Sequence, residues 1–343
     1  MGLITKSQPP KVGVDISTTA VKLLQLSRQG DRYRVEHYAI EPLPPNAVVD
    51  GNIVEPEIVG EAIHRAVARS GSRAKHAVAA VPGSAVIAKL IGMPADLSED
   101  DLESQVELEA VNYVPYPIDE VNLDFEVVGP MPGNDELSQV LLVASRAEEV
   151  ERRASALEVG GLVARVMDVE TFAIENAYRL LEGGTGEGLA ALVDIGAVTT
   201  TLHVLRNGRS LYNREQVFGG KQLDDEIMRR YGMAAEEARL AKRDGVLPED
   251  YTEEVLQPFR EALVQQVSRL LQFFYAGSEF NRVDRIVLAG GTASTPGVAN
   301  LVEEQLGVPT TIANPLAQMT LGPRVRAPAL AQDAPALMIA AGL

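Results

Sequence analysis

The amino-acid sequence predicts an α/β protein made of two halves of similar design. Three observations carry this prediction. Short apolar stretches typical of strands alternate with stretches of helical spacing. The chain has 343 residues, which is enough for two or more folded units. One hairpin-like motif occurs twice, at an offset of 179 residues from Asp15 to Asp194.

The first part of the chain alternates strands and helices in this order: two strands and a tight turn over Val12–Leu26, a strand over Tyr33–Tyr38, a helix over Glu57–Ala68 and a strand over Lys75–Val81. The helix is expected because Ile58, Ile63 and Val67 fall on one face. A segment of different composition follows. Its elements are strands over Val86–Met93, Val121–Val128 and Val140–Ser145, and a helix from its cap residue Ser98 to about Asn112.

After this segment come a helix over Glu148–Val159, a buried strand over Val163–Asp168 and a further helix to about Leu181. The glycine-rich run Gly183–Gly188 is the candidate hinge. Beyond it we expect a strand over Leu189–Asp194, more strands to Val217, charged helices over 221–280, a strand over Ile286–Ala289 and an apolar terminal helix over Leu337–Leu343.

Composition argues against several classes of function. Lys and Arg number 31 against 48 Asp and Glu, and this net charge of −17 disfavours nucleic-acid binding and docking by charge onto an anionic membrane. The chain has no cysteine and four scattered histidines, which argues against disulfides, thiol catalysis and structural zinc. No apolar run approaches the roughly 20 residues that span a bilayer, and no signal peptide is evident. We therefore expect a cytoplasmic protein without direct membrane insertion.

Each copy of the repeated motif has an apolar strand that ends in aspartate, Asp15 or Asp194, then a turn of small residues and a second apolar strand. The backbone N–H groups and hydroxyls of such a turn can bind a phosphate oxygen. The aspartate is placed to hold Mg²⁺ through water, and Lys22 adds a positive charge after the first turn. One copy alone could be an ordinary β-hairpin. Two copies together favour a pair of phosphate-binding turns.

A third element supports this interpretation. A buried strand ends in Gly290-Gly291, where the missing Cβ atoms would let a base or ribose lie on the backbone. Taken alone, this element could be a generic strand–turn–helix connection. The run Gly219-Gly220-Lys221 fails as a P-loop, because Glu215 replaces the first glycine and Gln222 replaces the Ser or Thr.

In this order and spacing, the two aspartate turns and the Gly-Gly element resemble the actin, Hsp70 and sugar-kinase superfamily of nucleotide-binding proteins. A narrower resemblance rests on the block Tyr113-Val114-Pro115-Tyr116-Pro117, on the opening segment Gly13–Leu24 and on Val217–Asp224. These segments are similar to the PilM family of actin-like type IV pilus assembly proteins. The resemblance extends from about residue 12 to residue 343.

The resemblance implies an actin-like (ribonuclease H-like) fold, in which duplicated βα domains flank a nucleotide cleft in an FtsA-like layout. It implies four subdomains: 1A over residues 1–83 and 150–183, an inserted 1C over 84–149, 2A over 184–220 and 281–343, and 2B over 221–280.

The same resemblance implies ATP or ADP as cofactor, with Mg²⁺ held by Asp15 and Asp194 through water. It assigns the first phosphate loop to Asp15, Ser17, Thr18, Thr19 and Lys22. It assigns the second loop to Asp194, Gly196, Ala197, Thr199 and Thr200. Further nucleotide contacts are assigned to Gly219, Gly220, Lys221, Asp224, Gly290, Gly291, Thr292 and Ala293.

Hydrolysing relatives carry an acidic or amide residue that orients the attacking water, after the strand that corresponds to Val163–Asp168. Asp168 and Glu170 are the candidates for this catalytic role, although the match is imperfect. Either could instead be an acid at a helix N-terminus. The sequence therefore leaves open whether the chain is an enzyme, and we expect at most weak ATPase activity.

The implied function is that of a cytoplasmic ATP-binding scaffold in type IV pilus biogenesis and twitching motility. The implied partner is the N-terminal cytoplasmic peptide of PilN, bound in a groove between 1A and 1C, which would bring the chain to the inner membrane. Other pilus assembly proteins and ATPases, and a second copy of the chain, are further candidate partners. Two alternatives stay open: a small-molecule kinase or phosphatase of the same superfamily, and an FtsA-like filament-forming protein.

Overall fold

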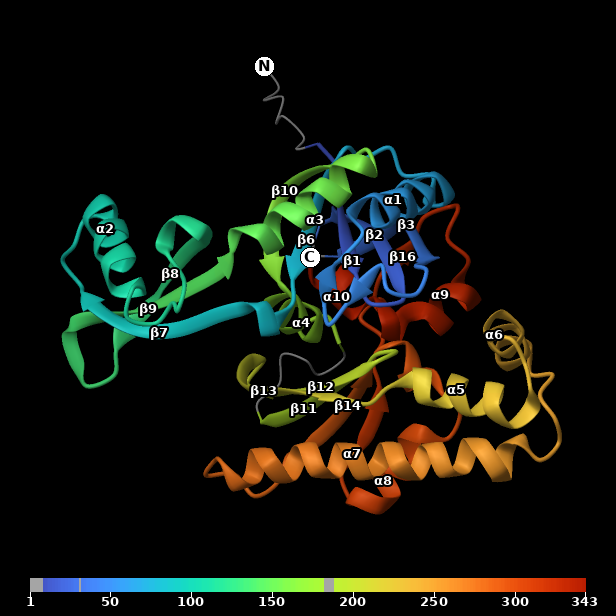
Figure 1. Cartoon of the computed structure of the whole chain (residues 1–343). Coiled ribbons are helices and arrows are strands. Elements are labelled where there is room, and N and C mark those ends of the chain that lie inside the picture. The colour runs from blue at the N-terminus through green and yellow to red at the C-terminus, as the bar shows by residue number, and fades with distance from the viewer. Residues whose placement is uncertain (1–8, 31, 182–187) are drawn as a thin grey trace. The chain divides into compact units, whose positions relative to one another are not determined.

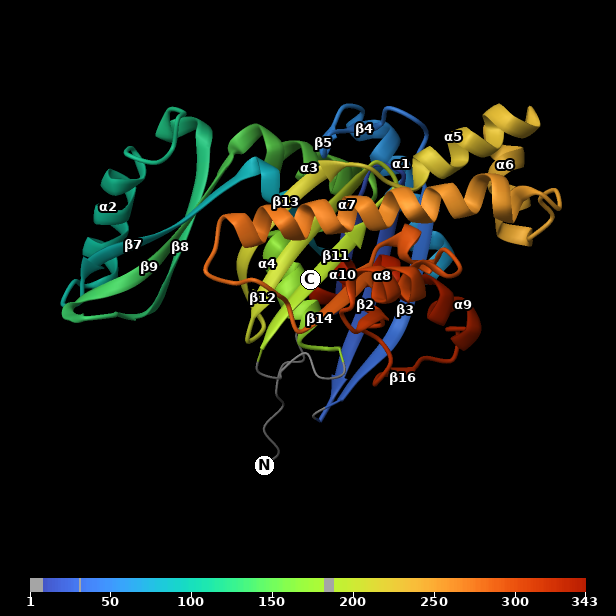
Figure 2. The same cartoon turned by 90° about the horizontal axis from the view of Figure 1, so that it is seen from below.

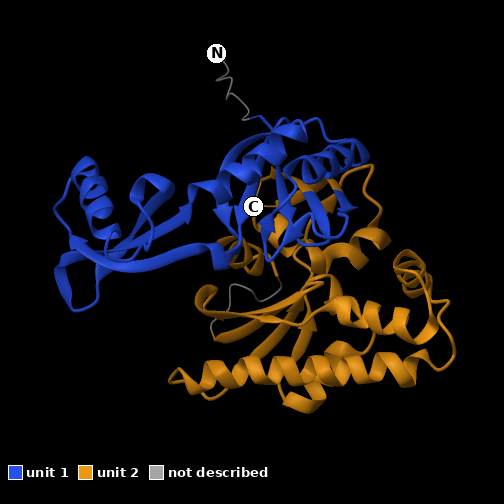
Figure 3. Ribbon diagram, viewed as in Figure 1, with its two compact units in different colours: residues 1–23, 39–170 blue, residues 24–38, 171–343 orange. Residues whose placement is uncertain are grey.

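The computed structural model describes residues 9–30, 32–181 and 188–343. The chain divides into two units, which Figure 3 shows in two colours. Unit 1 comprises residues 1–23 and 39–170, and unit 2 comprises residues 24–38 and 171–343. The candidate hinge at Gly183–Gly188 lies, except for Gly188, outside the described residues. The four subdomain boundaries implied by the resemblance stay a prediction.

A six-stranded sheet has the order β10-β6-β1-β2-β3-β16. Its strands are β1 (Lys11–Ile16), β2 (Ala20–Gln29), β3 (Arg32–Pro42), β6 (His76–Val81), β10 (Val163–Val169) and β16 (Thr320–Leu321). Strand β6 pairs in parallel with both β1 and β10, and the boundary between the units falls within β2 and β3. A hairpin of β4 (Val48–Val49) and β5 (Asn52–Ile53), which the sequence did not predict, precedes helix α1.

Two helices of unit 1, α1 (Pro56–Ser70) and α3 (Ala147–Val159), pack on the sheet through a core that includes Val14, Ile63 and Leu157. The prediction of a buried strand at Val163–Asp168 is right about the strand and wrong about its burial. Val163 is 52% exposed and Val166 is 45% exposed. The reason is the strand order, because β10 lies at the edge of the sheet.

Residues 86–146 of unit 1 form a separate three-stranded antiparallel sheet, β7-β9-β8, with one helix (Figure 1). The elements are β7 (Val86–Pro94), β8 (Val121–Met131), β9 (Asn134–Arg146) and α2 (Glu99–Ala110). Ser98 caps α2 as predicted, since its Oγ accepts a hydrogen bond from Asp101 N at 3.2 Å. Helix α2 packs on the sheet through residues such as Leu102, Val106 and Leu142.

Unit 2 contains a five-stranded sheet of order β13-β12-β11-β14-β15. Its strands are β11 (Leu189–Ile195), β12 (Thr199–Arg206), β13 (Arg209–Val217), β14 (Arg285–Ala289) and β15 (Thr310–Ile312). The long helix α7 (Gln257–Ala276) crosses one face of this sheet, as Figure 2 shows, and packs on it through residues such as Val267 and Leu271. No helix in the described ranges is long and apolar enough to cross a membrane.

The other helices of unit 2 are short. They are α4 (Glu170–Tyr178, its first residue in unit 1), α5 (Gly220–Tyr231), α6 (Ala235–Asp244), α8 (Val298–Leu306), α9 (Ala327–Asp333) and α10 (Met338–Gly342). The helix expected to reach Leu181 therefore ends at Tyr178. The apolar C-terminal segment forms the expected buried helix, since Met338, Ala340 and Ala341 are all buried.

Candidate functional site

The two repeated hairpins have the same backbone turn. In the first, Ser17 N donates a hydrogen bond to Ala20 O at 3.0 Å. In the second, Gly196 N donates to Thr199 O at 2.9 Å. These two bonds connect residues at the same offset of 179 that separates Asp15 from Asp194. The internal repeat detected in the sequence therefore corresponds to one local structure that occurs once in each unit.

In the first turn, Asp15 is buried at the end of β1, with 2% of its surface exposed. Lys22, from the second strand of the hairpin, donates from Nζ to Asp15 Oδ2 at 2.8 Å. The other carboxylate oxygen, Oδ1, is buried and has no hydrogen-bond partner among the described residues. Ser17 Oγ donates to Ala20 O at 2.9 Å, while Thr18 is half-buried and Thr19 is exposed.

In the second turn, three segments meet. Gly220 N donates to Gly196 O at 3.0 Å and Lys221 N donates to Ala197 O at 2.8 Å. Thr292 donates from Oγ1 to Gly196 O at 2.8 Å. These bonds bring together residues that the resemblance assigned to one nucleotide site. The first N–H groups of α5 are consequently used by carbonyls of the turn.

Close backbone packing explains why glycine occurs at these positions. A Cβ atom on Gly219 would lie 2.5 Å from Ala197 O, and one on Gly290 would lie 2.3 Å from Ile195 O and 2.4 Å from Asp194 Oδ1. Gly290 also has a φ of +86°, which disfavours other residues. The Gly-Gly element thus packs directly against the end of β11, where Asp194 lies half-buried.

Other predicted contact residues are engaged within unit 2. Thr200 is buried, and its Oγ1 donates to Phe218 O at 2.7 Å. Lys221 pairs with Asp225 at 2.5 Å on the exposed side of α5, and Asp224 pairs with Lys242 of α6. Thr199 is half-buried at the start of β12. Gly291, Thr292 and Ala293 lie in a 3₁₀ helix over Gly291–Ser294. The assignment of these residues to a nucleotide stays a prediction.

The two catalytic candidates lie where β10 ends and α4 begins. Asp168 is level with Ala80 of β6, while Val14 on the opposite side of β6 is level with Ala79. The register therefore places Asp15 and Asp168 on either side of Ala80, separated by two strand spacings, or about 10 Å. Burial raises the pKa of Asp168, whose Oδ1 accepts a hydrogen bond from Val169 N at 2.7 Å. Glu170 is half-buried as the first residue of α4.

Sequence reasoning missed Arg153, which supports the same sheet edge. Its guanidinium is buried and donates to Ala80 O at 3.0 Å, to Gly51 O at 2.5 Å and to Glu149 Oε2 at 3.0 Å. Ala80 is the residue between Asp15 and Asp168, so Arg153 holds the strand end that separates them. The only signal in the sequence is a Glu–Arg pair four residues apart on a predicted helix.

The first turn is suited to a cation that is held mainly by water and phosphate. No group of three or more metal-ligating side chains occurs in the part of the chain that the structure describes. Mg²⁺ commonly binds proteins through only one or two carboxylates, together with waters and substrate phosphates. The buried, unpartnered Oδ1 of Asp15 is a donor of this kind, so the residues present fit the ion.

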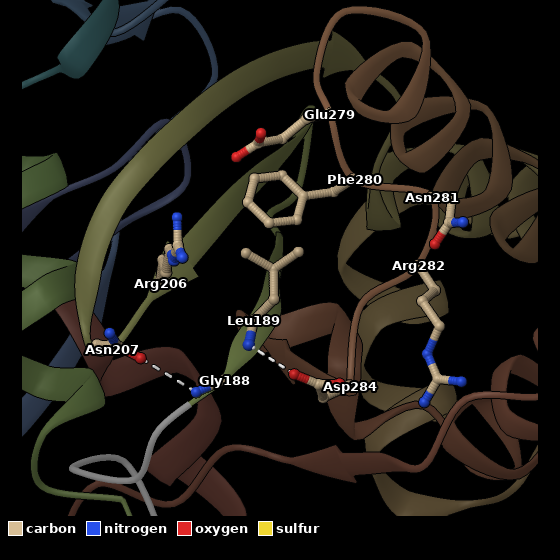
Figure 4. A pocket seen from close by; sticks show the side chains of 9 residues that line it. All are labelled: Gly188, Leu189, Arg206, Asn207, Glu279, Phe280, Asn281, Arg282 and Asp284. Atoms are coloured by element: carbon tan, nitrogen blue, oxygen red, sulfur yellow. Dashed lines mark hydrogen bonds between the residues drawn. The ribbon is translucent and has the colours of Figure 1, made fainter.

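A pocket in unit 2 lies apart from these residues. It has a volume of about 580 Å³, and Figure 4 shows its lining residues: Gly188, Leu189, Arg206, Asn207, Glu279, Phe280, Asn281, Arg282 and Asp284. Leu189 N donates to Asp284 Oδ2 at 2.7 Å and Arg206 lies over the ring of Phe280 at 5.5 Å. Leu189 begins β11, whereas Asp194 is near its end, so the pocket and the second turn lie at opposite ends of this strand.

Comparison with known proteins gives the family. A chain of a solved structure described as the PilM-PilN type IV pilus biogenesis complex is 30% identical, with 97% of each chain covered and a TM-score of 0.78. The ethanolamine utilization protein EutJ from Carboxydothermus hydrogenoformans is 18% identical, with 98% of this chain and 89% of that chain covered and a TM-score of 0.61. MreB 5 of Spiroplasma citri, solved with AMPPNP, is 14% identical, with 98% and 95% covered and a TM-score of 0.52.

The last two likenesses show the fold alone, and they confirm the actin-like fold that the resemblance implied. The family model for the type IV pilus assembly protein PilM matches residues 13–343, which is nearly the whole chain. This chain therefore belongs to the PilM family of type IV pilus assembly proteins.

Proposed function

We propose that this chain is an ATP-binding scaffold of type IV pilus assembly that binds the N-terminal cytoplasmic peptide of PilN. One observation carries the proposal: the chain matches, over 97% of its length and at 30% identity, a chain of a solved PilM-PilN complex. Binding of this peptide would place the protein at the cytoplasmic face of the inner membrane. It would link the membrane-embedded assembly complex to the machinery on the cytoplasmic side.

We further propose that ATP or ADP binds through the two aspartate turns. Loop one would use Asp15, Lys22 and the hydroxyl group of the exposed Thr19. Loop two would use the backbone around Gly196, which Thr292 and Gly220 hold in place. Mg²⁺, when bound, would neutralise phosphate charge beside Asp15 and Asp194. The likeness to a protein solved with AMPPNP supports a nucleotide role for this fold.

The residues of the proposed site account for binding of the nucleotide more readily than for its rapid hydrolysis. The carboxyl group of Asp168 is tied to Val169 N and its pKa is raised by burial. A base that must orient water also needs a free oxygen directed at the phosphate. We propose that Asp168 is the water-positioning residue of a slow hydrolysis, and that the nucleotide serves mainly to set the conformation of the scaffold.

Calorimetric titration with Mg²⁺·ATP tests the nucleotide part. The protein should first be stripped of any nucleotide that purifies with it. We expect binding by the wild type and at least tenfold weaker binding by Asp15→Ala and by Asp194→Ala. Asp135→Ala is the control, because this aspartate is exposed near the β8–β9 turn. A folded wild-type protein that takes up no ATP would remove the nucleotide from the proposal.

A labelled PilN N-terminal peptide tests the partner part by fluorescence anisotropy. We expect saturable binding to the wild type, with an affinity that changes when Mg²⁺·ATP is added. A nucleotide can shift the peptide affinity only through unequal affinity for two conformations. If the peptide binds with the same affinity with and without ATP, the protein is an adaptor whose binding of PilN is not switched by the nucleotide. Absence of peptide binding would overturn PilN as the partner.

A further inference from the structure

The three-stranded sheet of residues 86–146 has one covered face and one bare face. Successive residues of a strand point to opposite faces, so the register assigns each side chain to a side. Helix α2 covers the side of Ile91, Val140 and Leu142, which are all buried. The alternate residues form the opposite side, where Leu90 is 58% exposed. Nothing in the described part of the chain covers Leu90.

The bare face has an apolar strip and an acidic border. Its first row across the sheet is Leu90, Leu141 and Glu126, and the next is Ala88, Val143 and Asp124. Leu141 and Val143 lie on the central strand β9 and are still only half-buried, while Asp124 and Glu126 on β8 are exposed. The outer face of a half-solvated antiparallel sheet is normally polar. Here two of its three strands present aliphatic side chains instead.

The charge of this segment is strongly negative. Residues 84–146 contain thirteen Asp and Glu residues against two bases, Lys89 and Arg146, so they carry −11 of the total net charge of −17. Neither base belongs to the bare face. Lys89 pairs with Leu142 on the register of the covered side, and Arg146 lies over the ring of Tyr116 at 5.6 Å. Neither Lys89 nor Arg146 is therefore placed to neutralise the carboxylates of Asp124 and Glu126.

Charge decides which occupant fits this surface. A second copy of the chain would bring two segments of charge −11 together, and an anionic lipid surface would repel the same segment. A cationic partner gains from both features, because its apolar side can cover the strip while its charges meet the acidic border. Asp124 and Glu126 are two residues apart on one strand, or about 7 Å. This spacing suits Lys or Arg at positions i and i+4 of a helix, about 6 Å apart.

We propose that the bare face of the β7-β9-β8 sheet docks a basic amphipathic helix of a partner protein. The helix lies with its apolar side on Leu90, Leu141 and Val143 and its basic side toward Asp124 and Glu126. Because the acidic border runs along β8 only, it fixes which side of the helix faces that strand. The proposal does not depend on the PilN contact proposed above, and the last measurement below tests whether the two surfaces are separate.

A synthetic 18-residue peptide of Lys and Leu, with the leucines on one helical face, serves as the probe. Its binding to the full-length chain is measured by fluorescence anisotropy, beside a Glu–Leu peptide of the same pattern. We expect saturable binding of the Lys–Leu peptide only. Leu90→Glu should weaken it at least tenfold, and so should the double variant Asp124→Lys/Glu126→Lys. The six native side chains that these variants and the controls below replace are all exposed, and circular dichroism checks the fold of each variant.

Matched controls separate this surface from general charge attraction. Leu108→Glu alters a leucine of α2 that is 71% exposed, and Glu103→Lys/Glu107→Lys makes the same change in net charge on that helix. Both controls should bind the probe as the wild type does. Equal weakening in controls and face variants would overturn the proposal, and so would no binding at all.

Two further measurements address the other occupants. Sedimentation of the wild type should show no dimer that Leu90→Glu dissociates; such a dimer would make a second copy the occupant and overturn the proposal. The labelled PilN peptide should bind the face variants unchanged. If the face variants lose binding of both the PilN peptide and the Lys–Leu probe, the two ligands share one surface and the proposal is overturned. If the PilN peptide fails to bind even the wild type, only the proposed function is affected.

Discussion

In the first hairpin, Asp15 lies buried and Lys22 from the adjoining strand neutralises it at 2.8 Å. In the second hairpin, the residue at the position of Lys22 is Thr201, and Asp194 instead packs against the backbone of Gly290. The turn itself is the same in both, with hydrogen bonds of 3.0 and 2.9 Å. The same hairpin turn therefore has different surroundings in the two units. In unit 1 the aspartate has a charged neighbour, Lys22, and in unit 2 the end of the strand packs closely against the backbone of Gly290.

This difference separates what is local from what is tertiary. The turn is predicted by a local pattern of a strand, small residues and a second strand, and both copies of that pattern form it. The surroundings of the aspartate come from distant parts of the chain, which differ between the two units. Substitutions that remove a charge should consequently harm the first hairpin, and substitutions that add volume should harm the second.

The largest effect is expected from Gly290→Ala. The added Cβ would lie 2.3 Å from Ile195 O at a φ of +86°, so steric overlap and backbone strain should together cost about 4 kcal/mol or more of unfolding free energy. Gly307→Ala is the control, since its φ is +65° and, apart from its neighbours in the chain, no described residue comes within 4 Å of the added Cβ. It should cost about 1–2 kcal/mol. Urea unfolding followed by circular dichroism measures both; equal costs would refute the packing argument.

Arg153→Met should have the next largest effect, in unit 1. It leaves the buried Glu149 without this partner and frees Ala80 O, at an expected cost of about 3–5 kcal/mol. Arg152→Met on the same helix alters an exposed pair with Glu148 and one hydrogen bond to Ile53 O, so it should cost clearly less than Arg153→Met. Adding Glu149→Leu to Arg153→Met should recover part of the loss. If Arg153→Met and Arg152→Met lower the unfolding free energy by similar amounts, the buried pair of Arg153 and Glu149 has no structural role.

The sequence predicted the parts of the site that depend on local pattern. Both hairpins, the Gly-Gly element and the cap at Ser98 combine strand or helix spacing with turn residues, and all are present in the structure. The exposure of Val163 could not be predicted in this way, because an apolar strand has the same local pattern at the edge of a sheet as in its centre.

The role of Arg153 was missed for a related reason. Its acceptors, Gly51 O and Ala80 O, are 102 and 73 residues away in the sequence. Such contacts depend on how α3 packs beside β6, and one sequence carries no local signal for that packing. The resemblance to a family supplied the order of the site elements, but it did not supply the residues that support them from behind.

Lys22→Met tests the charge support of the first hairpin directly. Asp15 would stay buried and lose the ammonium group of Lys22, so we expect a loss of about 3 kcal/mol of unfolding free energy. The equivalent change in the second hairpin, Thr201→Val, removes no charge and should cost less than about 1 kcal/mol. Lys22→Arg should restore most of the stability. If Lys22→Met and Thr201→Val are equally mild in urea unfolding, the two hairpins do not differ in the way argued above.

The smallest effect concerns acid sensitivity, in which the second hairpin should again differ from the first. His203 occupies the position of Leu24; it is buried, its Nδ1 has no partner within the described residues, and burial lowers its pKa to about 4. The unfolded chain binds the proton near pH 6.5, so His203 lowers stability as the pH falls from about 6.5 toward 4. The loss should reach about 2–3 kcal/mol at pH 4.5. His203→Leu makes this position like the first hairpin and should remove that part of the stability difference between pH 7 and pH 4.5.

His64→Gln, which replaces an exposed histidine of α1, is the control and should leave the stability difference between pH 7 and pH 4.5 unchanged. Identical acid sensitivity in all three proteins would mean that His203 is solvated and that the second hairpin is no more vulnerable to acid than the first.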